Sequence, residues 1–390
     1  MKICVVSPGY PGNVNPWNGI LIKEDARNIS RTGCDVSVVT SKVFSEDPSF
    51  FLDGDVKVNR FWFPSERKLL AEYDNIPVFR VGVYLLSGIL RTVRVVRREK
   101  SDVIHAHWAI PAGFIATVAG RLTRKPVVLT VHDADITTFP DKSKIAGKCI
   151  TYALNHAAVI ICVNHFLEDR VKNYFHIDPA KVRFIPLGIN KDLFQRIDKA
   201  EARRKLKLPA DKTLILYLGS MLEIKGVRHL TEAIPKVAAG HDNVLFLMAG
   251  HGPLEGEVKA RLKELNVGES VRLVGSIPHD DIPVWMSAAD VLVIPSLSEG
   301  RPRVGLEALS IGLPIVGSRV GAIPEIIKDG ENGLIVESGS GDSLAAAFNS
   351  ILDDKELYER LRAGAKLLPE FDATVAAGRV VKVYEEVTKR

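Results

Sequence analysis

Most of the 390-residue chain alternates short apolar runs of strand length with longer segments of helical periodicity. In the first half, the apolar runs predict strands at residues 2–7, 36–39, 56–63, 103–106, 127–131, 158–163 and 182–185. The segments between them predict helices at residues 20–31, 81–96, 112–122, 145–156 and 167–175. Such an alternation is typical of a parallel sheet with helices on both faces.

The same alternation begins again after a polar and basic stretch between residues 190 and 211. Strands are predicted at residues 214–218, 244–248, 271–274, 291–294, 315–316 and 333–336, and only helices after residue 342, the last at 373–388. We place the interdomain linker near residues 186–200. The predicted fold class is α/β, with two Rossmann-like, doubly wound parallel-sheet domains. Ligands bind beyond the carboxyl ends of strands in such sheets, so two domains that face each other across a cleft would suit transfer between two substrates.

Composition and charge narrow the class of protein. Hydrophobic residues make up 46% and charged residues 25%, as in soluble globular proteins, and the net charge of +5 favours anionic ligands rather than nucleic acid. Cys4, Cys34, Cys149 and Cys162 are widely spaced, which predicts reduced core thiols and no metal site. The first apolar run ends at Pro8 and no run reaches ~20 apolar residues, so the sequence predicts neither secretion nor a membrane span. We expect a cytoplasmic protein.

One stretch, residues 295–314, places charges where packing alone would not. It joins a buried strand to a helix that starts beside Pro302. Its two acids, Glu299 and Glu307, flank a helix start whose free backbone NH groups favour an anion. Arg301 and Arg303 add positive charge where helices prefer acids, a mismatch that a bound phosphate would resolve. The alternative is two solvated acids with arginine ion partners.

Two common nucleotide sites do not fit the sequence. The first loop, residues 9–19, lacks the G-x-G-x-x-G spacing, and the second strand ends without an acid for a ribose, which disfavours a nicotinamide enzyme. Residues 219–226 loosely resemble a P-loop but lack a glycine before Lys225 and a serine or threonine after it, which argues against a P-loop ATPase.

Three strand-end loops carry further polar candidates. Lys225 can reach a phosphate while Gly226 lets backbone approach; the alternative is a helix-start turn with a solvated lysine. Gly250 either allows close backbone approach to a ligand or marks a simple turn. His132 is flanked by acids in the sequence Thr-Val-His-Asp-Ala-Asp at residues 130–135, and is either a polar site residue or a structural histidine.

Together these residues resemble the family-4 retaining glycosyltransferases of GT-B fold (glycosyl transferases group 1) over nearly the whole chain. The family's E-x7-E signature is matched by Glu299 and Glu307. Other stretches that resemble the family lie at residues 19–24, 102–107, 130–133, 185–190, 249–253, 271–276, 321–325 and 329–334.

The resemblance implies a division of the chain and an activity. Residues 1–190 would form an N-terminal, acceptor-side domain and residues 191–372 a C-terminal domain for the nucleotide-sugar donor, while a helix at residues 373–390 would pack back on the first domain. The implied enzyme moves a hexose from a nucleotide diphosphate sugar to a hydroxyl acceptor, which is a glycan, a lipid-linked molecule or a small molecule, with retention of configuration. We expect no metal or other cofactor, because lysine, arginine and a helix N-terminus can stabilise the phosphate charge.

The resemblance also implies roles for single residues. His132 would lie at the donor sugar, Glu299 would hold that sugar, and Lys225 would bind the pyrophosphate. Glu307 would hydrogen-bond the ribose. The remaining donor-binding residues that it implies are Gly19, Gly300, Arg301, Arg303 and Val304 at the phosphates, Ser276 and Ile277 at the base, and Ser220 and Gly250 in neighbouring loops.

One position departs from the family. Ser220 stands where many members carry an arginine after the first glycine of the lysine loop, and loss of a guanidinium would weaken stabilisation of the leaving pyrophosphate. We hypothesise that Arg301 or Arg303 compensates. Two alternatives stay open: a nucleotide-sugar epimerase, which would need no acceptor, and a non-catalytic nucleotide-sugar-binding protein, for which Ser220 is the only hint.

The helix predicted within residues 79–100 raises the question of membrane contact. It combines apolar residues with Arg91, Arg94, Arg97, Arg98 and Lys100. Such a helix can dock on anionic lipid, which would place the basic N-terminal domain peripherally at the inner membrane face. The pattern slightly favours the alternative, a core helix with a solvated basic end.

Overall fold

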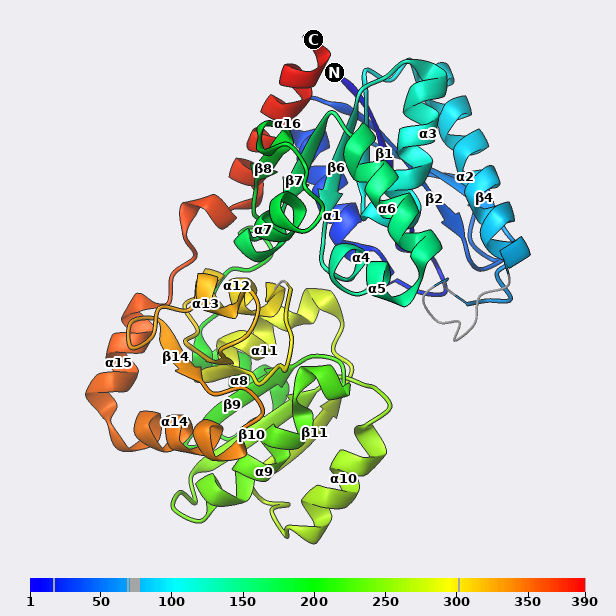
Figure 1. The fold of residues 1–390 in the computed structure, drawn as a ribbon. Coiled ribbons are helices and arrows are strands. Elements are labelled where there is room, and N and C mark those ends of the chain that lie inside the picture. Colours follow the sequence, from blue (N-terminus) through cyan, green and yellow to red (C-terminus); the bar gives the residue numbers. More distant parts are fainter. Residues whose placement is uncertain (17, 69, 71–77, 301, 390) are drawn as a thin grey trace. The chain divides into compact units, whose positions relative to one another are not determined.

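A computed structural model describes residues 1–390 except 17, 69, 71–77, 301 and 390. The chain divides into two compact units (Figure 1). The first comprises residues 1–188 and the C-terminal residues 373–390, and the second comprises residues 189–372. Each unit is an α/β sheet with helices on both faces, as the alternation of apolar and helical segments predicts.

In the described residues, the sheet of the first unit has the strand order β3-β4-β2-β1-β5-β6-β7-β8. Its strands are β1 (Lys2–Val6), β2 (Asp35–Lys42), β3 (Phe50–Asp53), β4 (Val56–Trp62), β5 (Val103–His107), β6 (Val127–Val131), β7 (Val159–Cys162) and β8 (Val182–Phe184). Its helices are α1 (Ile20–Arg31), α2 (Val78–Glu99), α3 (Phe114–Thr123), α4 (Ala134–Thr137), α5 (Phe139–Lys142), α6 (Lys144–His156), α7 (His165–Asn173) and α16 (Ala373–Thr388). Every described pair of neighbouring strands is parallel except β3 with β4.

The second unit is smaller and wholly parallel in its described strand pairs, with the order β11-β10-β9-β12-β13-β14. Its strands are β9 (Thr213–Leu218), β10 (Val244–Ala249), β11 (Val271–Gly275), β12 (Val291–Ile294), β13 (Ile315–Ser318) and β14 (Gly333–Val336). Its helices are α8 (Lys199–Leu206), α9 (Val227–Ala238), α10 (Glu255–Glu264), α11 (Ile282–Ala288), α12 (Arg303–Ser310), α13 (Ile323–Ile326), α14 (Gly341–Asp353) and α15 (Lys355–Gly364).

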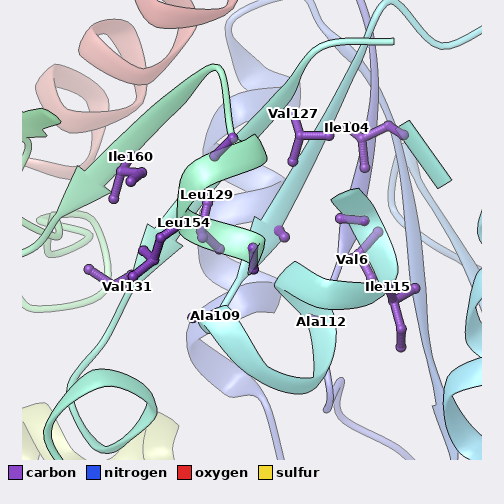
Figure 2. Packing of buried hydrophobic residues seen from close by; sticks show 14 of the residues in the cluster. Val6, Ile104, Ala109, Ala112, Ile115, Val127, Leu129, Val131, Leu154 and Ile160 are labelled. Atoms are coloured by element: carbon purple, nitrogen blue, oxygen red, sulfur yellow. The ribbon is translucent and has the colours of Figure 1, made fainter. Parts of the chain in front are cut away.

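Alternate residues of each strand enter two separate cores, because successive side chains of a strand point to opposite faces of the sheet. In the first unit, Ile104 of β5 and Leu129 of β6 pack with Leu154 of α6 on one face, as Figure 2 shows. Val103 of β5 belongs instead to the core that α1 and α16 cover on the other face. Burial on both faces explains why these strands are continuous apolar runs in the sequence.

Helix α16 follows the second unit in the sequence but belongs to the first unit, where Figure 1 shows it in red. Tyr384 is fully buried in the core that α16 shares with α1. Arg183 of β8 donates two hydrogen bonds to the carboxylate of Glu386, at 2.9 and 3.3 Å, and Arg379 donates to the Phe184 carbonyl at 2.8 Å. Apolar burial and these ionic contacts therefore anchor the helix on the first sheet.

The structure departs from the predicted elements mainly at a sheet edge. Strand β3, the antiparallel edge strand, was not predicted, because its sequence Phe-Phe-Leu-Asp is short and follows a polar loop. The four cysteines are free thiols, three of them buried. Among the described helices, none is long and apolar enough to cross a membrane.

Candidate active site

Two loops of the second unit meet where the order of its strands reverses. Strands β9 and β12 are neighbours, and the chain continues from β9 to β10 on one side and from β12 to β13 on the other. The loop after β9 leads to α9, and the loop after β12 leads to α12. Loops at such a switch point diverge to opposite sides of the sheet, which makes it the usual ligand position in a doubly wound fold.

The first charged pair of the site joins these two loops. Lys225 donates a hydrogen bond from Nζ to Oε2 of Glu299 at 2.6 Å, and the hydroxyl of Ser296 donates to the same oxygen at 3.3 Å. The Glu299 side chain is 11% exposed and that of Lys225 is 32% exposed. A charge-assisted bond of this kind fixes both side chains while leaving the lysine accessible to an anion.

Glycine is required where the two loops touch. Gly226 has a φ of 67°, and a Cβ at this position would lie 1.8 Å from the carbonyl oxygen of Pro295. Next to this contact, the amide of Leu297 donates to the Ile224 carbonyl at 2.9 Å. Only glycine combines the left-handed conformation with this close approach, so Gly226 places Lys225 beside Glu299.

The second charged pair lies at the start of α12. Arg303 donates from Nε to Oε1 of the buried Glu307 at 2.7 Å, one helical turn further on. His279, after β11, places Nε2 3.8 Å from the same oxygen, and its ring contacts Phe194 edge-to-face with centroids 5.7 Å apart. Among the described residues, no side chain caps this helix start and its first turn contains no acid. Its amides and Arg303 therefore favour an anion.

Other predicted donor residues are placed around these pairs. Gly300 is buried and Val304 half-buried, and both belong to the segment that enters α12, whereas Arg301 lies outside the described residues. Ser276 is exposed and Ile277 half-buried in the loop after the edge strand β11. A Cβ on Gly250 would lie 1.8 Å from the Gly219 carbonyl oxygen, so contact between loops already accounts for that glycine.

Ser220, the position at which the sequence departs from the family, is exposed at the start of the loop that carries Lys225. Its carbonyl accepts a hydrogen bond of 2.8 Å from the hydroxyl of Tyr217. Burial, and secondarily the charge of Glu299, raise the pKa of Tyr217 well above its usual range, so this hydroxyl stays a donor. Tyr217 thus fixes the backbone at Ser220, whatever the side chain there contributes.

In the first unit, the predicted residue His132 follows β6 beside the end of β5. Its Nε2 is 3.1 Å from Nδ1 of His107, and its ring stacks on Trp108 with centroids 4.2 Å apart. Both histidines are buried. The ring of His132 therefore contacts His107 and Trp108, two residues that the sequence analysis did not single out.

The side chain of Asp135 binds backbone amides and not the His132 ring. Its carboxylate accepts hydrogen bonds from the amides of Ala109 at 2.7 Å, Asp133 at 2.9 Å and His132 at 3.2 Å. Full burial raises the pKa of Asp135, against the opposing effect of these amides. Asp135 therefore joins the loop after β5 to the loop after β6. Its hydrogen bonds also fix the backbone at His132, where the chain leaves β6.

Gly19 closes the loop between β1 and α1. It has a φ of 76°, and a Cβ there would lie 2.3 Å from the carbonyl oxygen of Gly9. The carbonyl of Gly19 accepts hydrogen bonds from the amides of Ile22 and Lys23, and these bonds close the first turn of α1. The buried Arg60 reaches into this loop and donates to the Pro11 carbonyl at 2.7 Å.

The predicted site residues thus fall into two sets, one in each unit, and the contacts of the described residues join Lys225 to Glu299 and Arg303 to Glu307 in the second unit, whereas none joins Gly19 to His132 in the first. Sequence reasoning missed His107 and Trp108 in the first unit, and Tyr217 and His279 in the second. A signal for His107 existed: His105 and His107 stand at alternate positions of an otherwise apolar strand, and therefore on one face of the sheet. No local pattern marked His279, whose relation to Glu307 depends on the packing of α12.

Family models match both halves of the chain. The model described as glycosyl transferases group 1 matches residues 198–368, and the model described as glycosyl transferase 4-like domain matches residues 21–188. The chain belongs to the group 1 glycosyltransferases.

Relatives of this glycosyltransferase match it from end to end. The Bacillus subtilis protein named "Putative teichuronic acid biosynthesis glycosyltransferase TuaC" is 28% identical over 100% of this chain and 99% of its own length. The D-inositol 3-phosphate glycosyltransferase of Thermobispora bispora is 26% identical over 98% of this chain and 91% of its own length.

Solved structures show that this glycosyltransferase has the GT-B fold. Sucrose-phosphate synthase from Thermosynechococcus elongatus has a TM-score of 0.81 at 22% identity, covering 100% of this chain and 99% of that chain. Anabaena HepE, solved in complex with UDP-glucose, has a TM-score of 0.76 at 19% identity, covering 99% of this chain and 100% of that chain.

Proposed function

We propose that this glycosyltransferase moves a hexose from a nucleotide diphosphate sugar to a hydroxyl acceptor with retention of configuration and without a metal ion. The observation that carries the proposal is the pair of cation–carboxylate contacts, Lys225 with Glu299 and Arg303 with Glu307, at the β9/β12 switch point. The complex of HepE with UDP-glucose supports a donor of this chemical class.

Each contact offers one group for phosphate and one for hydroxyls. Lys225 binds the pyrophosphate, and Glu299, which Lys225 holds in place, accepts hydrogen bonds from hydroxyls of the donor sugar. Arg303 and the amides at the start of α12 bind the phosphates, and Glu307 accepts from the ribose hydroxyls. Glu307 is buried and fixed by Arg303, so its carboxylate is oriented before the nucleotide arrives.

In the reaction, the bond between the anomeric carbon and the pyrophosphate breaks, and the electron pair leaves with the phosphate oxygen. The acceptor oxygen forms the new glycosidic bond and loses its proton. Negative charge therefore develops on the pyrophosphate, where Lys225, Arg303 and the helix start stabilise it, and these groups take the place of a metal ion. His132 of the first unit is the polar group at the donor sugar.

Incubation with labelled nucleotide sugars and candidate acceptors tests this function directly. We expect one donor to be consumed faster when an acceptor is present, an initial product with the anomeric configuration of the donor by NMR, and unchanged turnover in EDTA. Glu299→Gln should abolish transfer. Wild-type turnover in Glu299→Gln would refute the site, an inverted product would refute retention, and isomerised donor without acceptor would indicate an epimerase.

We also propose that the first unit docks on anionic lipid through α2. Its buried residues include Tyr84 and Val95, but Phe79, Leu86 and Leu90 are 75%, 60% and 61% exposed. The same exposed stripe continues into Arg94 and Arg97. The solvent-facing side of a helix that packs on a sheet is normally polar, so this apolar and basic stripe fits acyl chains and anionic headgroups.

Strand β3 carries a further exposed apolar residue near the basic end of α2. Its exposed Phe50 pairs in register with Asn59, so both side chains lie on one face of the sheet. Arg98 of α2 donates to Oδ1 of Asn59 at 3.0 Å, which brings the basic end of the helix to that face. Basic and apolar side chains are thus neighbours here, as binding to an anionic membrane requires.

Vesicle flotation tests the lipid proposal. We expect the protein to float with anionic vesicles and not with neutral ones, and the double variant Leu86→Gln/Leu90→Gln to lose flotation. The matched control, Ile145→Gln/Phe166→Gln, removes two apolar side chains that are exposed elsewhere on the first unit and should float as wild type. Absence of the wild-type protein from both vesicle types would remove the lipid proposal and leave the transferase proposal intact.

A further inference from the structure

One face of the first sheet changes from apolar to polar toward the ends of β5 and β6. On β5, Val103 is followed on the same face by His105 and His107, and on β6 Val128 is followed by Thr130. All of these side chains are buried. A polar group in such a core destabilises the fold unless it is hydrogen-bonded, so the partners of the histidines are informative.

His105 is held from two sides. Its Nδ1 is 2.6 Å from the hydroxyl of Tyr384 on α16, and its Nε2 is 2.7 Å from Oγ1 of Thr130. Burial lowers the pKa of His105 to about 3, so the ring is neutral, and burial raises the pKa of Tyr384 well above its usual range, so its hydroxyl stays protonated. We assign the Tyr384 hydroxyl as the donor to Nδ1, which puts the ring proton of His105 on Nε2, facing Thr130.

Ring contacts continue from His105 to the candidate site. The ring of His105 lies against that of His107, with centroids 4.4 Å apart and planes 35° apart. Nδ1 of His107 is 3.1 Å from Nε2 of His132. The contacts therefore form a continuous chain from α16, through His105 and His107, to His132 at the end of β6.

We propose that His107 is a positioning residue for His132, and that His105 and the Tyr384 hydroxyl of α16 hold His107 in place. The proposal rests on the role given to His132 in the proposed function. A nitrogen of His107 fixes the orientation and the tautomer of the His132 ring, while Trp108 stacks on that ring. The C-terminal helix thus contributes to the site through two intervening imidazoles.

Substitutions of His107 test the direct contact. His107→Phe keeps an aromatic ring against His105 but removes Nδ1, and we expect kcat to fall on the order of tenfold to a hundredfold because His132 loses its orientation. The donor KM should stay within about twofold, because the residues proposed to bind the nucleotide lie in the second unit. His107→Asn, whose amide lies near the position of Nδ1, should recover most of the loss.

Substitution of Tyr384 tests the contact through α16. Tyr384→Phe keeps the packing and removes the hydroxyl, and we expect kcat to fall about threefold to tenfold with an unchanged donor KM. Tyr84→Phe is the matched control: it removes the hydroxyl of another buried tyrosine in the same unit, whose ring packs against Phe61 and Phe63. The control should retain the wild-type kcat.

A spectroscopic measurement separates positioning from activity. In histidine labelled with 15N in the ring, long-range nitrogen–proton correlation spectra identify which ring nitrogen carries the proton. We expect wild-type His105 as the Nε2-protonated tautomer across pH 5–8, with peaks assigned by His→Gln variants. Tyr384→Phe should shift the ring signals of His105, His107 and His132, and Tyr84→Phe should shift none of them.

The outcomes distinguish this inference from the proposed function. If His132→Ala abolishes transfer but His107→Phe retains the wild-type kcat, the positioning role is wrong and the function stands. If His132→Ala retains full activity, the role of His132 in the function is wrong. If His107→Phe does not fold, the test moves to His107→Asn and to the wild-type spectrum, where His105 protonated on Nδ1 would overturn the assigned chain of contacts.

Discussion

The carboxyl ends of β9 and β12 in the second unit carry ion pairs, whereas those of β5 and β6 in the first unit carry imidazoles. In the second unit, Lys225 is partly exposed and bonds to Glu299, and Arg303 bonds to Glu307. In the first unit, His107 and His132 are buried and contact each other and aromatic rings. The carboxyl ends of parallel strands thus carry charged pairs in the second unit and contacts between buried rings in the first.

The difference follows from what each set of loops exposes to water. Lys225 is partly exposed, so it can contact an incoming phosphate while it keeps Glu299 in place, whereas the Arg303–Glu307 pair is largely buried and keeps the carboxylate of Glu307 fixed. Burial disfavours charge in the first unit, where it holds the pKa of His105 at about 3. The second unit therefore offers a partly exposed cation to a charged ligand, whereas the first unit holds His105 as a buried, neutral ring.

Among the substitutions that test this comparison, Lys225→Met should have the largest effect on activity. It removes the cation proposed for the pyrophosphate and leaves Glu299 without its 2.6 Å partner. We expect kcat/KM for the donor to fall on the order of a hundredfold to a thousandfold. The measurement is initial-rate kinetics with saturating acceptor.

Lys236→Met is the control for that substitution. Lys236 lies on α9 of the same unit and pairs with the exposed Asp342, so its removal changes net charge equally. It should leave kcat/KM within about twofold of wild type, because exposed pairs contribute little. A similar loss of kcat/KM in both variants would mean that the overall electrostatic field of the second unit, and not the contact of Lys225 with Glu299, causes the effect.

Gly226→Ala tests the loop contact that joins Lys225 to Glu299. The added Cβ would meet the Pro295 carbonyl at 1.8 Å, so we expect the loops to separate, with weaker nucleotide binding and a loss of stability of about 3 kcal/mol or more. Gly330→Ala is the matched control: its φ of 75° is similar to the 67° of Gly226, but its Cβ would meet nothing within 4 Å. It should cost about 1 to 2 kcal/mol and leave binding intact.

Chemical denaturation and calorimetric titration with nucleoside diphosphates measure the two effects. Equal losses of stability in the two variants would attribute the cost to backbone conformation alone. In that case, the contact between the two loops would not hold the charged pair together.

The sequence predicts most of the fold because both sheets are buried on two faces. Strands β6, β12 and β14 begin and end at the predicted residues, and so do α1 and α16. Strand β3 was missed because an edge strand needs apolar residues on only one face and its pairing is set by β4. A short edge strand that pairs antiparallel is therefore harder to predict than a strand in a parallel ladder, and even the parallel edge strand β14 was predicted.

The candidate site was only partly predictable, and for a different reason. Glu299 and Lys225 occur in loops whose charges are visible in the sequence, whereas their contact depends on the neighbouring order of β9 and β12. The sequence placed acids beside His132, but folding turns Asp135 toward backbone amides and brings His107 to the ring. Sequence spacing can thus indicate a local pair such as Arg303 with Glu307, one helical turn apart, but not a pair between two loops such as Lys225 with Glu299.

Arg303→Gln tests whether Arg303 compensates for Ser220. If the arginine stabilises the leaving pyrophosphate, kcat should fall about tenfold, with a further effect on nucleotide affinity because Glu307 loses its 2.7 Å partner. Ser220→Arg, added to the Arg303→Gln chain, should restore kcat but not affinity. An unchanged kcat in Arg303→Gln, and separately in Arg301→Ala, would show that neither arginine compensates.

The smallest effect concerns His105 of the first unit, through which acid should destabilise the fold. Burial lowers the pKa of this ring from 6.5 to about 3, so between these values the unfolded chain binds a proton that the folded chain does not. The free energy of unfolding should therefore fall as the pH falls from 6.5 toward 3, by at most about 1.4 kcal/mol per pH unit from this residue.

Denaturation between pH 6.5 and 4.5 measures how steeply the free energy of unfolding depends on pH. The slope should be shallower in His105→Gln than in wild type, whereas His156→Gln, which removes an exposed histidine of the same unit, should keep the wild-type slope. Identical slopes for wild type and His105→Gln would mean that the folded chain protonates this ring as readily as the unfolded chain does, and burial would then not keep His105 neutral.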